Sequence, residues 1–256
     1  MRGQGSGVVN LGTDGSPSRP RTRGGTRPYL SFELRNCRLP LLSKVAYLGP
    51  MLERDFDSAV PQGEFFERYE KGDLPWQIDR PQPEVLRLIE EGKFESPILD
   101  LGCGAGDNAL ELARRGYRVL GMDVVPEALR RAREKAEKAG LPQPPEFLLG
   151  DALQLEESGL EAETILDCAL FHIFEDEERP AYVRGLEAVL SSGGRLHILS
   201  FSELETREPG PRRLSRESIA GAFGKDWTLE EAVRCRYWDR VRPDGAHAWR
   251  VTFRKG

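Results

Sequence analysis

The stretch at residues 98–106 limits the possible folds of this chain more than any other. It runs Ile-Leu-Asp-Leu-Gly-Cys-Gly-Ala-Gly, so an apolar strand containing Asp100 leads into glycines at positions 102, 104 and 106. A helix with periodic apolar residues follows them. Glycine permits backbone conformations that other residues avoid, and it lets a ligand approach the main chain closely. The pattern predicts a strand, a ligand-binding loop and a helix in succession.

A second acidic residue ends the next predicted strand. Residues 119–122 are Val-Leu-Gly-Met, and Asp123 follows them. A carboxylate at this position of an α/β fold can accept hydrogen bonds from two hydroxyls of a ribose. The loop and the carboxylate together predict a pocket for an adenosine-containing cofactor. Taken singly, the glycines could form an ordinary tight turn, and Asp123 could cap the helix that opens near Pro126.

Asp107 narrows the choice of cofactor. The dinucleotide-binding fingerprint is G-x-G-x-x-G, and Asp107 occupies the place of its third glycine. A pyrophosphate bound at a helix N-terminus needs free N–H donors and is repelled by a carboxylate. Asp107 therefore argues against NAD or FAD, and we expect it to cap the helix that follows.

The order D-x-G-x-G-x-G resembles motif I of the class I S-adenosylmethionine-dependent methyltransferases, and the family's later motifs follow in order. The resemblance extends from about Trp76 to the C-terminus. It implies S-adenosylmethionine as cofactor, with the glycines under its methionine part and Asp100 near its ammonium group. It places Asp123 at the ribose and Asp151 at the adenine amine, although Asp151 alone would be interpreted as a solvated loop acid. The residues implied to bind the cofactor are Trp76, Asp100, Gly102, Cys103, Gly104, Asp123, Val124, Asp151, Ala152 and Asp167.

Strands and helices alternate along most of the chain, which is typical of a parallel sheet covered on both faces. The fold class is α/β, a Rossmann-like doubly wound sheet of seven strands, mostly parallel with a C-terminal antiparallel hairpin. The turn sequence at 242–245 should join the last two strands, and Gly193 and Gly194 should end the helix before the fifth strand. The expected helices are 63–72, 83–91, 107–115, 126–139, 177–190 and 215–223, and the expected strands are 97–102, 118–123, 146–150, 163–169, 194–201, 228–238 and 246–254.

The first 50 residues differ in composition from the rest. Their first half is rich in Gly, Ser, Arg and Pro and cannot bury enough apolar surface to become ordered. We interpret 1–50 as a disordered or dispensable extension and Met51 as the natural start. Residues 51–256 then form the methyltransferase domain, with an N-terminal flap and helices over 51–95 and the core over 96–256. The basic extension could also be an organellar targeting segment.

Composition argues against several classes of partner. Beyond residue 50 the chain carries 29 Lys or Arg against 40 Asp or Glu, a poor match for a nucleic acid. No apolar run approaches the roughly 20 residues that cross a bilayer. The four cysteines, at 37, 103, 168 and 235, are widely spread and lack metal-ligand or disulfide spacing. We predict a cytoplasmic protein without a metal, and the oligomeric state is left open.

The element from Pro75-Trp76 to Arg80-Pro81 resembles one in small-molecule methyltransferases for thiopurines, thiols, halides and tellurite. In that subfamily the tryptophan covers the cofactor or closes the pocket, although Trp76 could also simply anchor the flap. Phe171 follows the fourth strand, and Phe201 ends the fifth, at the edge where α/β sheets bind ligands. We expect Arg80, Phe171 and Phe201 to line the acceptor pocket.

His172 is the candidate catalytic base. The ordinary pKa of histidine, ~6.5, suits removal of a proton from a thiol, phenol or amine. A histidine bonded to backbone beside the cofactor explains the residue equally well. Asp167 either contacts the sulfonium end of the cofactor or supports the loop. Residues 203–213 form a candidate lid, in which Arg212 and Arg213 either bind an anionic acceptor or are solvated charges.

These features predict an S-adenosylmethionine-dependent methyltransferase that acts on a small-molecule acceptor. The Pro75-Trp76 element slightly favours a thiol or another soft nucleophile. Because the cofactor brings the reactive group, the protein mainly has to position the two substrates. Two other interpretations remain: a non-catalytic cofactor-binding or partner-binding module on the same fold, and a nucleotide-dependent oxidoreductase, which Asp107 disfavours.

Overall fold

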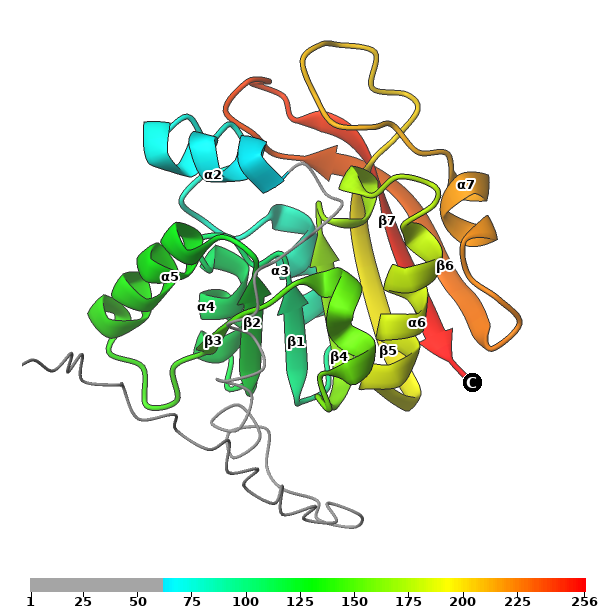
Figure 1. Ribbon diagram of the computed structural model, residues 1–256, viewed down its shortest axis with the longest axis horizontal. Helices are drawn as coiled ribbons and strands as arrows, with labels where there is room; N and C mark the ends of the chain where they lie inside the picture. Colours follow the sequence, from blue (N-terminus) through cyan, green and yellow to red (C-terminus); the bar gives the residue numbers. More distant parts are fainter. Residues whose placement is uncertain (1–61) are drawn as a thin grey trace, which may run out of the picture. The chain divides into compact units, whose positions relative to one another are not determined.

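The computed structural model describes residues 62–256, which contain a seven-stranded sheet in the order β3-β2-β1-β4-β5-β7-β6 (Figure 1). The strands are β1 (Ile98–Leu101), β2 (Val119–Asp123), β3 (Glu146–Leu149), β4 (Ala162–Cys168), β5 (Leu190–Phe201), β6 (Trp227–Tyr237) and β7 (Ala246–Lys255). The first five strands are parallel, and β7 lies antiparallel between β5 and β6. The predicted α/β fold with a C-terminal antiparallel hairpin is therefore confirmed. The predictions for 1–50 and for Met51 lie outside the described residues.

Helices pack on both faces of this sheet. They are α2 (Gln62–Lys71), α3 (Pro83–Glu90), α4 (Asp107–Arg114), α5 (Pro126–Ala139), α6 (Arg179–Val189) and α7 (Arg216–Gly221), with short 3₁₀ helices η1 (Ala152–Glu157) and η2 (Phe171–Ile173). Alternate residues of β1 point to opposite faces: Ile98 joins a buried cluster with α3, α4 and α5, and Leu99 joins one with η1, α6 and α7. The sheet is thus buried on both sides, as a parallel sheet requires.

The order of strands reverses at β1. This strand pairs with β2 on one side and with β4 on the other, so the chain leaves the carboxyl ends of β1 and β4 in opposite directions. Ligands of α/β proteins bind in the crevice outside such a reversal point. Asp100 lies opposite Leu166 and Leu101 opposite Asp167, so two acidic residues lie one register position apart at this edge, on opposite faces of the sheet.

The predicted role of Gly193 and Gly194 was wrong. Helix α6 ends at Val189, and both glycines lie inside β5. There the pairing with β4 is irregular: Ala162 pairs with Leu190, and the next pair is Thr164 with Arg195. Gly193, with φ of +80°, belongs to this irregular stretch rather than to a helix end. Pairing with β4 places the two glycines in a strand, and the preference of glycine for helix ends is a local signal that does not include this pairing.

Within the described part of the chain, no helix is long and apolar enough to cross a membrane. No group of three or more His, Cys, Asp or Glu side chains in residues 62–256 is placed to hold a metal ion. Cys103, Cys168 and Cys235 are free thiols. Cys37 lies outside the described residues.

The glycine loop after β1 rests on the aromatic ring of Phe147 from β3. A Cβ atom added to Gly106 would lie 3.0 Å from this ring, and one added to Gly121 would lie 2.8 Å from it and 2.9 Å from the sulfur of Cys103. The backbone at Gly106 and Gly121 therefore lies closer to the Phe147 ring than a residue with a Cβ atom would permit. This contact packs the loop against the sheet.

We expect Gly121→Ala to lower the free energy of unfolding by about 1–3 kcal/mol, because the added methyl group overpacks the layer under the glycine loop. Urea denaturation measures the change. Gly224→Ala is the matched control, since a Cβ there meets nothing within 4 Å. Its stability should equal or slightly exceed that of the wild type. Equal stability of the two variants would contradict the packing argument.

Candidate active site

The loop after β1 has an unusual backbone. Gly102, Gly104 and Gly106 have φ of +63°, +54° and +79°, conformations that side chains disfavour. The amide of Gly104 donates to Oδ2 of Asp123 at 2.8 Å, and the amide of Val125 donates to Oδ1 at 2.9 Å. Burial raises the pKa of Asp123, and these N–H donors lower it. One half-exposed carboxylate thus ties the loop to the start of α5.

Asp107 does not cap the helix that follows the loop. The N-cap of α4 is Gly106, and Asp107 is the first residue inside the helix. Its carboxylate instead accepts from Nζ of Lys135 at 2.8 and 2.9 Å and from Nε2 of Gln77 at 2.5 Å. The predicted cap was therefore wrong, because a lysine 28 residues away and a glutamine 30 residues away supply better partners.

Asp100 is a buried acid without a hydrogen-bond partner. Its side chain is 1% exposed, and neither carboxylate oxygen has a partner among residues 62–256. Burial, with the charges of Asp123 and Asp167, raises the pKa of Asp100 to about 8. Such a group is costly unless a cation or donor reaches it. The ammonium group of S-adenosylmethionine fits this need.

The predicted adenine end is formed by the ends of β2 and β3. Asp151 is 6% exposed and caps η1, because its Oδ1 accepts from the amide of Leu153 at 2.9 Å. It is therefore a buried cap rather than a solvated loop acid. Val124 and Ala152 are half-buried near these strand ends. Cys103 is also half-buried and packs against the cluster of α4 and α5.

Asp167 supports the loop after β4. It is fully buried, its Oδ1 accepts from the amides of Leu170 and Phe171, and its Oδ2 accepts from the hydroxyl of Tyr182 at 2.7 Å. Burial raises the pKa of Asp167 to about 6. Both oxygens are occupied by the protein, so this geometry favours the supporting role over contact with the cofactor.

His172 is hydrogen-bonded to the backbone, as the second of its two interpretations predicted. It is 3% exposed in η2, and its Nδ1 accepts from the amide of Phe201 at 3.1 Å. Since a main-chain N–H can only donate, the neutral ring carries its proton on Nε2. Burial, with nearby Arg179 and Arg213, lowers the pKa of His172 to about 3. A buried neutral histidine without a free lone pair is a poor base.

Helix α2 supplies a residue that sequence reasoning did not assign to the site. Tyr69 is 3% exposed, and its hydroxyl has no hydrogen-bond partner in the described chain. A Cβ on Gly104 would lie 3.2 Å from this hydroxyl, so the phenol lies over the glycine loop. The ring centroids of Tyr69 and Trp76 are 6.1 Å apart. The available signal was the spacing of Phe65, Phe66 and Tyr69 in the helix expected over 63–72.

The three residues predicted to line the acceptor pocket lie in three different environments. Phe201 lies in an apolar cluster with Tyr237, packed against Trp76 and Ala169. Phe171 is buried in the main core with Tyr182, in a different cluster from Trp76 and Phe201. Arg80 is exposed, with its guanidinium group 5.6 Å from the ring centroid of Trp238. Among the three, only Phe201 joins the cluster around Trp76.

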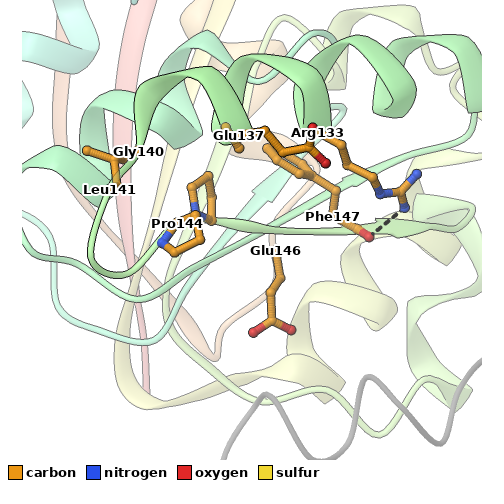
Figure 2. Close-up of a pocket in the computed structure, with 9 residues that line it drawn as sticks. Arg133, Glu137, Gly140, Leu141, Pro144, Glu146 and Phe147 are labelled. Atoms are coloured by element: carbon orange, nitrogen blue, oxygen red, sulfur yellow. Dashed lines mark hydrogen bonds between the residues drawn. The ribbon is translucent and has the colours of Figure 1, made fainter.

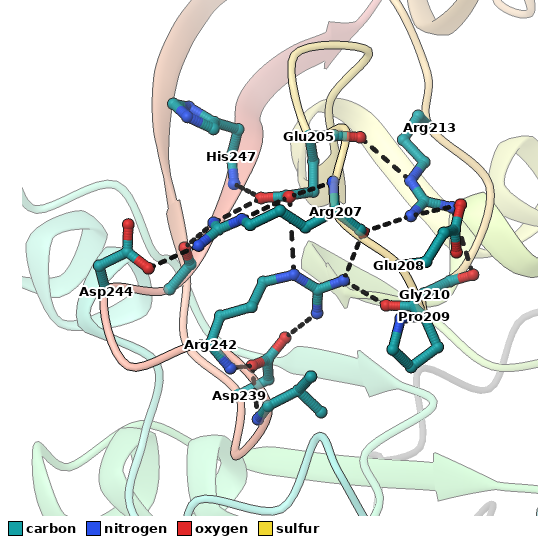
Figure 3. Close-up of polar contacts among 12 residues, drawn as sticks. Glu205, Arg207, Glu208, Pro209, Gly210, Arg213, Asp239, Arg242, Asp244 and His247 are labelled. Carbon is teal, nitrogen blue, oxygen red and sulfur yellow. Dashed lines mark hydrogen bonds and ion pairs between the residues drawn. The ribbon is translucent and has the colours of Figure 1, made fainter.

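A polar network holds the predicted lid, residues 203–213, in place (Figure 3). Glu205 has a fully buried side chain and accepts from the side chain of Arg207 and from the amide of His247. Buried Arg242 donates to Asp239 and to the carbonyls of Arg207 and Pro209. The lid is thereby attached to the connection between β6 and β7.

The lid arginines also have protein partners. Arg212 donates to the carbonyl of Phe174 and pairs with Glu175, whereas Arg213 donates to the carbonyl of Glu205. Arg212 and Arg213 are therefore neither simply solvated charges nor free to bind an anionic acceptor, because their contacts hold the loop in place.

A separate hollow of about 470 Å³ lies between α5 and the start of β3 (Figure 2). Apolar atoms dominate its lining, which includes Leu141, Pro144 and Phe147, and Arg133 crosses it to donate to the carbonyl of Phe147. Since Glu146 opens β3, this hollow lies at the opposite end of the strand from the predicted adenine contacts.

Known proteins share both the sequence pattern and the fold. Residues 98–194 match the sequence model of the methyltransferase domain family. The chain is 32% identical over 166 residues to a 2-heptyl-1-hydroxyquinolin-4(1H)-one methyltransferase of Mycobacteroides abscessus, covering 64% of this chain and 73% of the relative. It is 29% identical over 151 residues to a probable thiol methyltransferase 2 of Arabidopsis thaliana, covering 58% and 66%.

A solved structure agrees with these relatives. The protein described in work on the conversion of a disulfide bond into a thioacetal group during echinomycin biosynthesis superposes with a TM-score of 0.67. It is 31% identical, over 75% of this chain and 92% of that one. The chain belongs to the class I S-adenosylmethionine-dependent methyltransferases, and S-adenosylmethionine is its cofactor.

The buried acid predicts an unusual pH dependence. A carboxyl group whose pKa is higher in the folded state stabilises the fold at low pH, and this contribution is lost as the pH rises. For Asp100 the loss falls between about pH 4 and pH 8. We expect Asp100→Asn to raise the free energy of unfolding of the ligand-free protein at pH 8 by on the order of 1–3 kcal/mol, and to change it little at pH 4.

Urea denaturation at the two pH values measures this difference. Asp226→Asn, at an exposed position, is the control and should leave the pH dependence of the wild type unchanged. If Asp100→Asn shows the same pH dependence as the wild type, the carboxylate is not the uncompensated charge that we infer.

Proposed function

We propose that this protein transfers a methyl group from S-adenosylmethionine to a small-molecule acceptor with a soft nucleophilic atom, such as a thiol. The observation that carries the proposal is Asp100, a buried and unpartnered carboxylate beside the glycine loop, next to Asp123 on β2. Relatives named for a hydroxyquinolinone, a thiol and, in Brassica oleracea, thiocyanate support a small acceptor. When bound, S-adenosylmethionine supplies an electrophilic methyl group on a sulfonium.

The chain provides distinct partners for the parts of the cofactor. Asp100 would offset the positive charge of its amino group, and Asp123, which is half-exposed, would accept hydrogen bonds from its ribose hydroxyls. Trp76 packs with Val124 in one cluster and with Phe201 in another. It would therefore cover the cofactor on one side and border the acceptor on the other.

The acceptor side is apolar and aromatic. Phe201 and Tyr237 have ring centroids 5.3 Å apart, and Ala169 packs beside them with φ of +72°, a strained conformation at the end of β4. Arg242 stacks 5.3 Å from the ring of Phe201 while its guanidinium group binds the lid network. Such a wall would hold a small apolar or planar molecule and orient its nucleophilic atom.

Among the described residues, four groups near this wall are poor bases at neutral pH. His172 is buried with its Nδ1 engaged, and Asp167 has both oxygens hydrogen-bonded. Burial raises the pKa of Cys168 and of Tyr237 well above their ordinary values, so both stay protonated. We therefore propose that the acceptor arrives already ionised, or reacts through a neutral lone pair, and that the protein only positions it.

Three features of the whole chain complete the proposal. The acidic composition beyond residue 50 supports an acceptor other than a nucleic acid. Within the described residues, the free thiols of Cys103, Cys168 and Cys235 support a reducing, cytoplasmic setting. The division into a dispensable 1–50 and a methyltransferase domain over 51–256 stays a prediction, which deletion of 1–50 tests through folding and cofactor binding.

Calorimetry tests the choice of cofactor. We expect the wild type to bind S-adenosylmethionine and S-adenosylhomocysteine but not NAD, and Asp123→Ala to weaken both by about 1–3 kcal/mol through loss of charge-assisted hydrogen bonds. Absence of binding by the wild type would falsify the proposed function. Binding without methyl transfer to any acceptor tested would instead indicate a non-catalytic binding module.

A pH–rate series tests the absence of a base. With aryl thiols of graded pKa, we expect the inflection of kcat/KM to follow the pKa of each acceptor. His172→Gln should lower kcat/KM by less than about tenfold, whereas loss of a general base typically costs 10²–10⁴-fold. A pH profile that is the same for all thiols, together with a large loss in His172→Gln, would restore the histidine as base.

A further inference from the structure

Residues 74–82, here called the strap, run between α2 and α3 and touch both halves of the site. Toward the cofactor, Gln77 donates to Asp107, the first residue of α4, at 2.5 Å. The amide of Gln82 donates to Oδ1 of Asn108, the second residue of α4, at 2.9 Å. Both glutamines are buried, at 9% and 4% exposed. The strap is thus attached directly behind the glycine loop.

The same strap is attached to the connection between β6 and β7. The side-chain amide of Gln82 donates to the carbonyl of Trp238 at 2.8 Å, and its Oε1 accepts from the amide of Trp238 at 2.9 Å. The amide of Arg240 donates to the carbonyl of Pro75 at 2.7 Å. The backbone of Gln82 therefore binds α4 on the cofactor side of the site, and its side chain binds the β6–β7 connection on the acceptor side.

The connection between β6 and β7 is in turn hydrogen-bonded to the lid. Asp239 accepts from the amide and the guanidinium group of Arg242, at 2.7 and 2.6 Å. Arg242 in turn donates to carbonyls of the lid (Figure 3). Its guanidinium group also stacks on the ring of Phe201. A series of partly buried contacts consequently runs from the start of α4, behind the glycine loop, through Gln82 to the acceptor wall.

We propose that Gln82 is a positioning residue that couples cofactor binding at the glycine loop to ordering of the acceptor wall. The inference rests on the proposed function, because it needs the cofactor to bind beside α4. Ordering α4 and the strap fixes the backbone of Gln82, and its paired hydrogen bonds then fix Trp238 and the connection that carries Arg242. By linkage, a bound acceptor strengthens cofactor binding by the same factor.

Hydrogen exchange on the full chain tests this coupling without a known acceptor, with S-adenosylhomocysteine as the probe. In the wild type, we expect binding to slow exchange in 98–106 and also in 238–245, the latter by about fivefold or more, the usual size of coupling between sites. Gln82→Glu keeps the shape of the side chain but removes the donor to the Trp238 carbonyl. It should keep the effect at 98–106 and lose the effect at 238–245.

Two further variants make the test specific. Asn108→Ala breaks the attachment at α4 and should lose the same remote effect, which protects the test if Gln82→Glu folds poorly. Gln143→Glu is the matched control at an exposed position and should behave as the wild type does. A merely structural glutamine would lower the melting temperature without changing how 238–245 responds to the ligand.

Three outcomes would overturn the inference. If the wild type binds S-adenosylhomocysteine and exchange at 238–245 does not change, the coupling is absent and the proposed function stands. The same conclusion follows if both Gln82→Glu and Asn108→Ala keep the full effect of the ligand at 238–245. No binding of S-adenosylhomocysteine by the wild type removes the proposed function and the coupling with it.

Discussion

Two backbone N–H groups converge on the carboxylate of Asp123, and the cofactor end of the sheet depends on that convergence. One comes from Gly104 in the loop after β1, and the other from Val125 at the start of α5. The three glycines of this loop adopt left-handed conformations and carry no side chains that could fix it. The carboxylate of Asp123 on the neighbouring strand, together with the packing of the loop on Phe147, therefore sets where the loop runs.

Three acids meet at this edge of the sheet, and their partners give them different roles. The protein satisfies both oxygens of Asp167, which shapes the loop after β4. It uses Asp123 for two backbone amides and leaves Asp100 buried without a partner. Close acids repel one another and resist burial, so the arrangement destabilises the free protein. A cationic ligand group offsets this cost, which is why the unpartnered residue is the best indicator of function.

Local patterns predicted the elements well where local forces decide them. Helix α5 begins at Pro126 and ends before Gly140, as expected, because proline suits the first helical position and glycine the left-handed end. The same reasoning failed at Gly193, which lies in an irregular strand pairing, and at Asp107, which bonds to Lys135 rather than capping α4. In both cases contacts between distant parts of the chain outweighed a local preference.

The sequence by itself determined the parallel sheet, the glycine loop and the acidic residues at the strand ends. These follow from spacing alone, because the carboxyl ends of parallel strands meet at one edge. Only the tertiary structure decided what His172 can do, since the amide that occupies its Nδ1 belongs to Phe201 on β5. It also decided that Tyr69 lies over the loop and that Gln82 joins both halves of the site. Burial and protonation depend on neighbours remote in sequence, and folding alone brings those neighbours together.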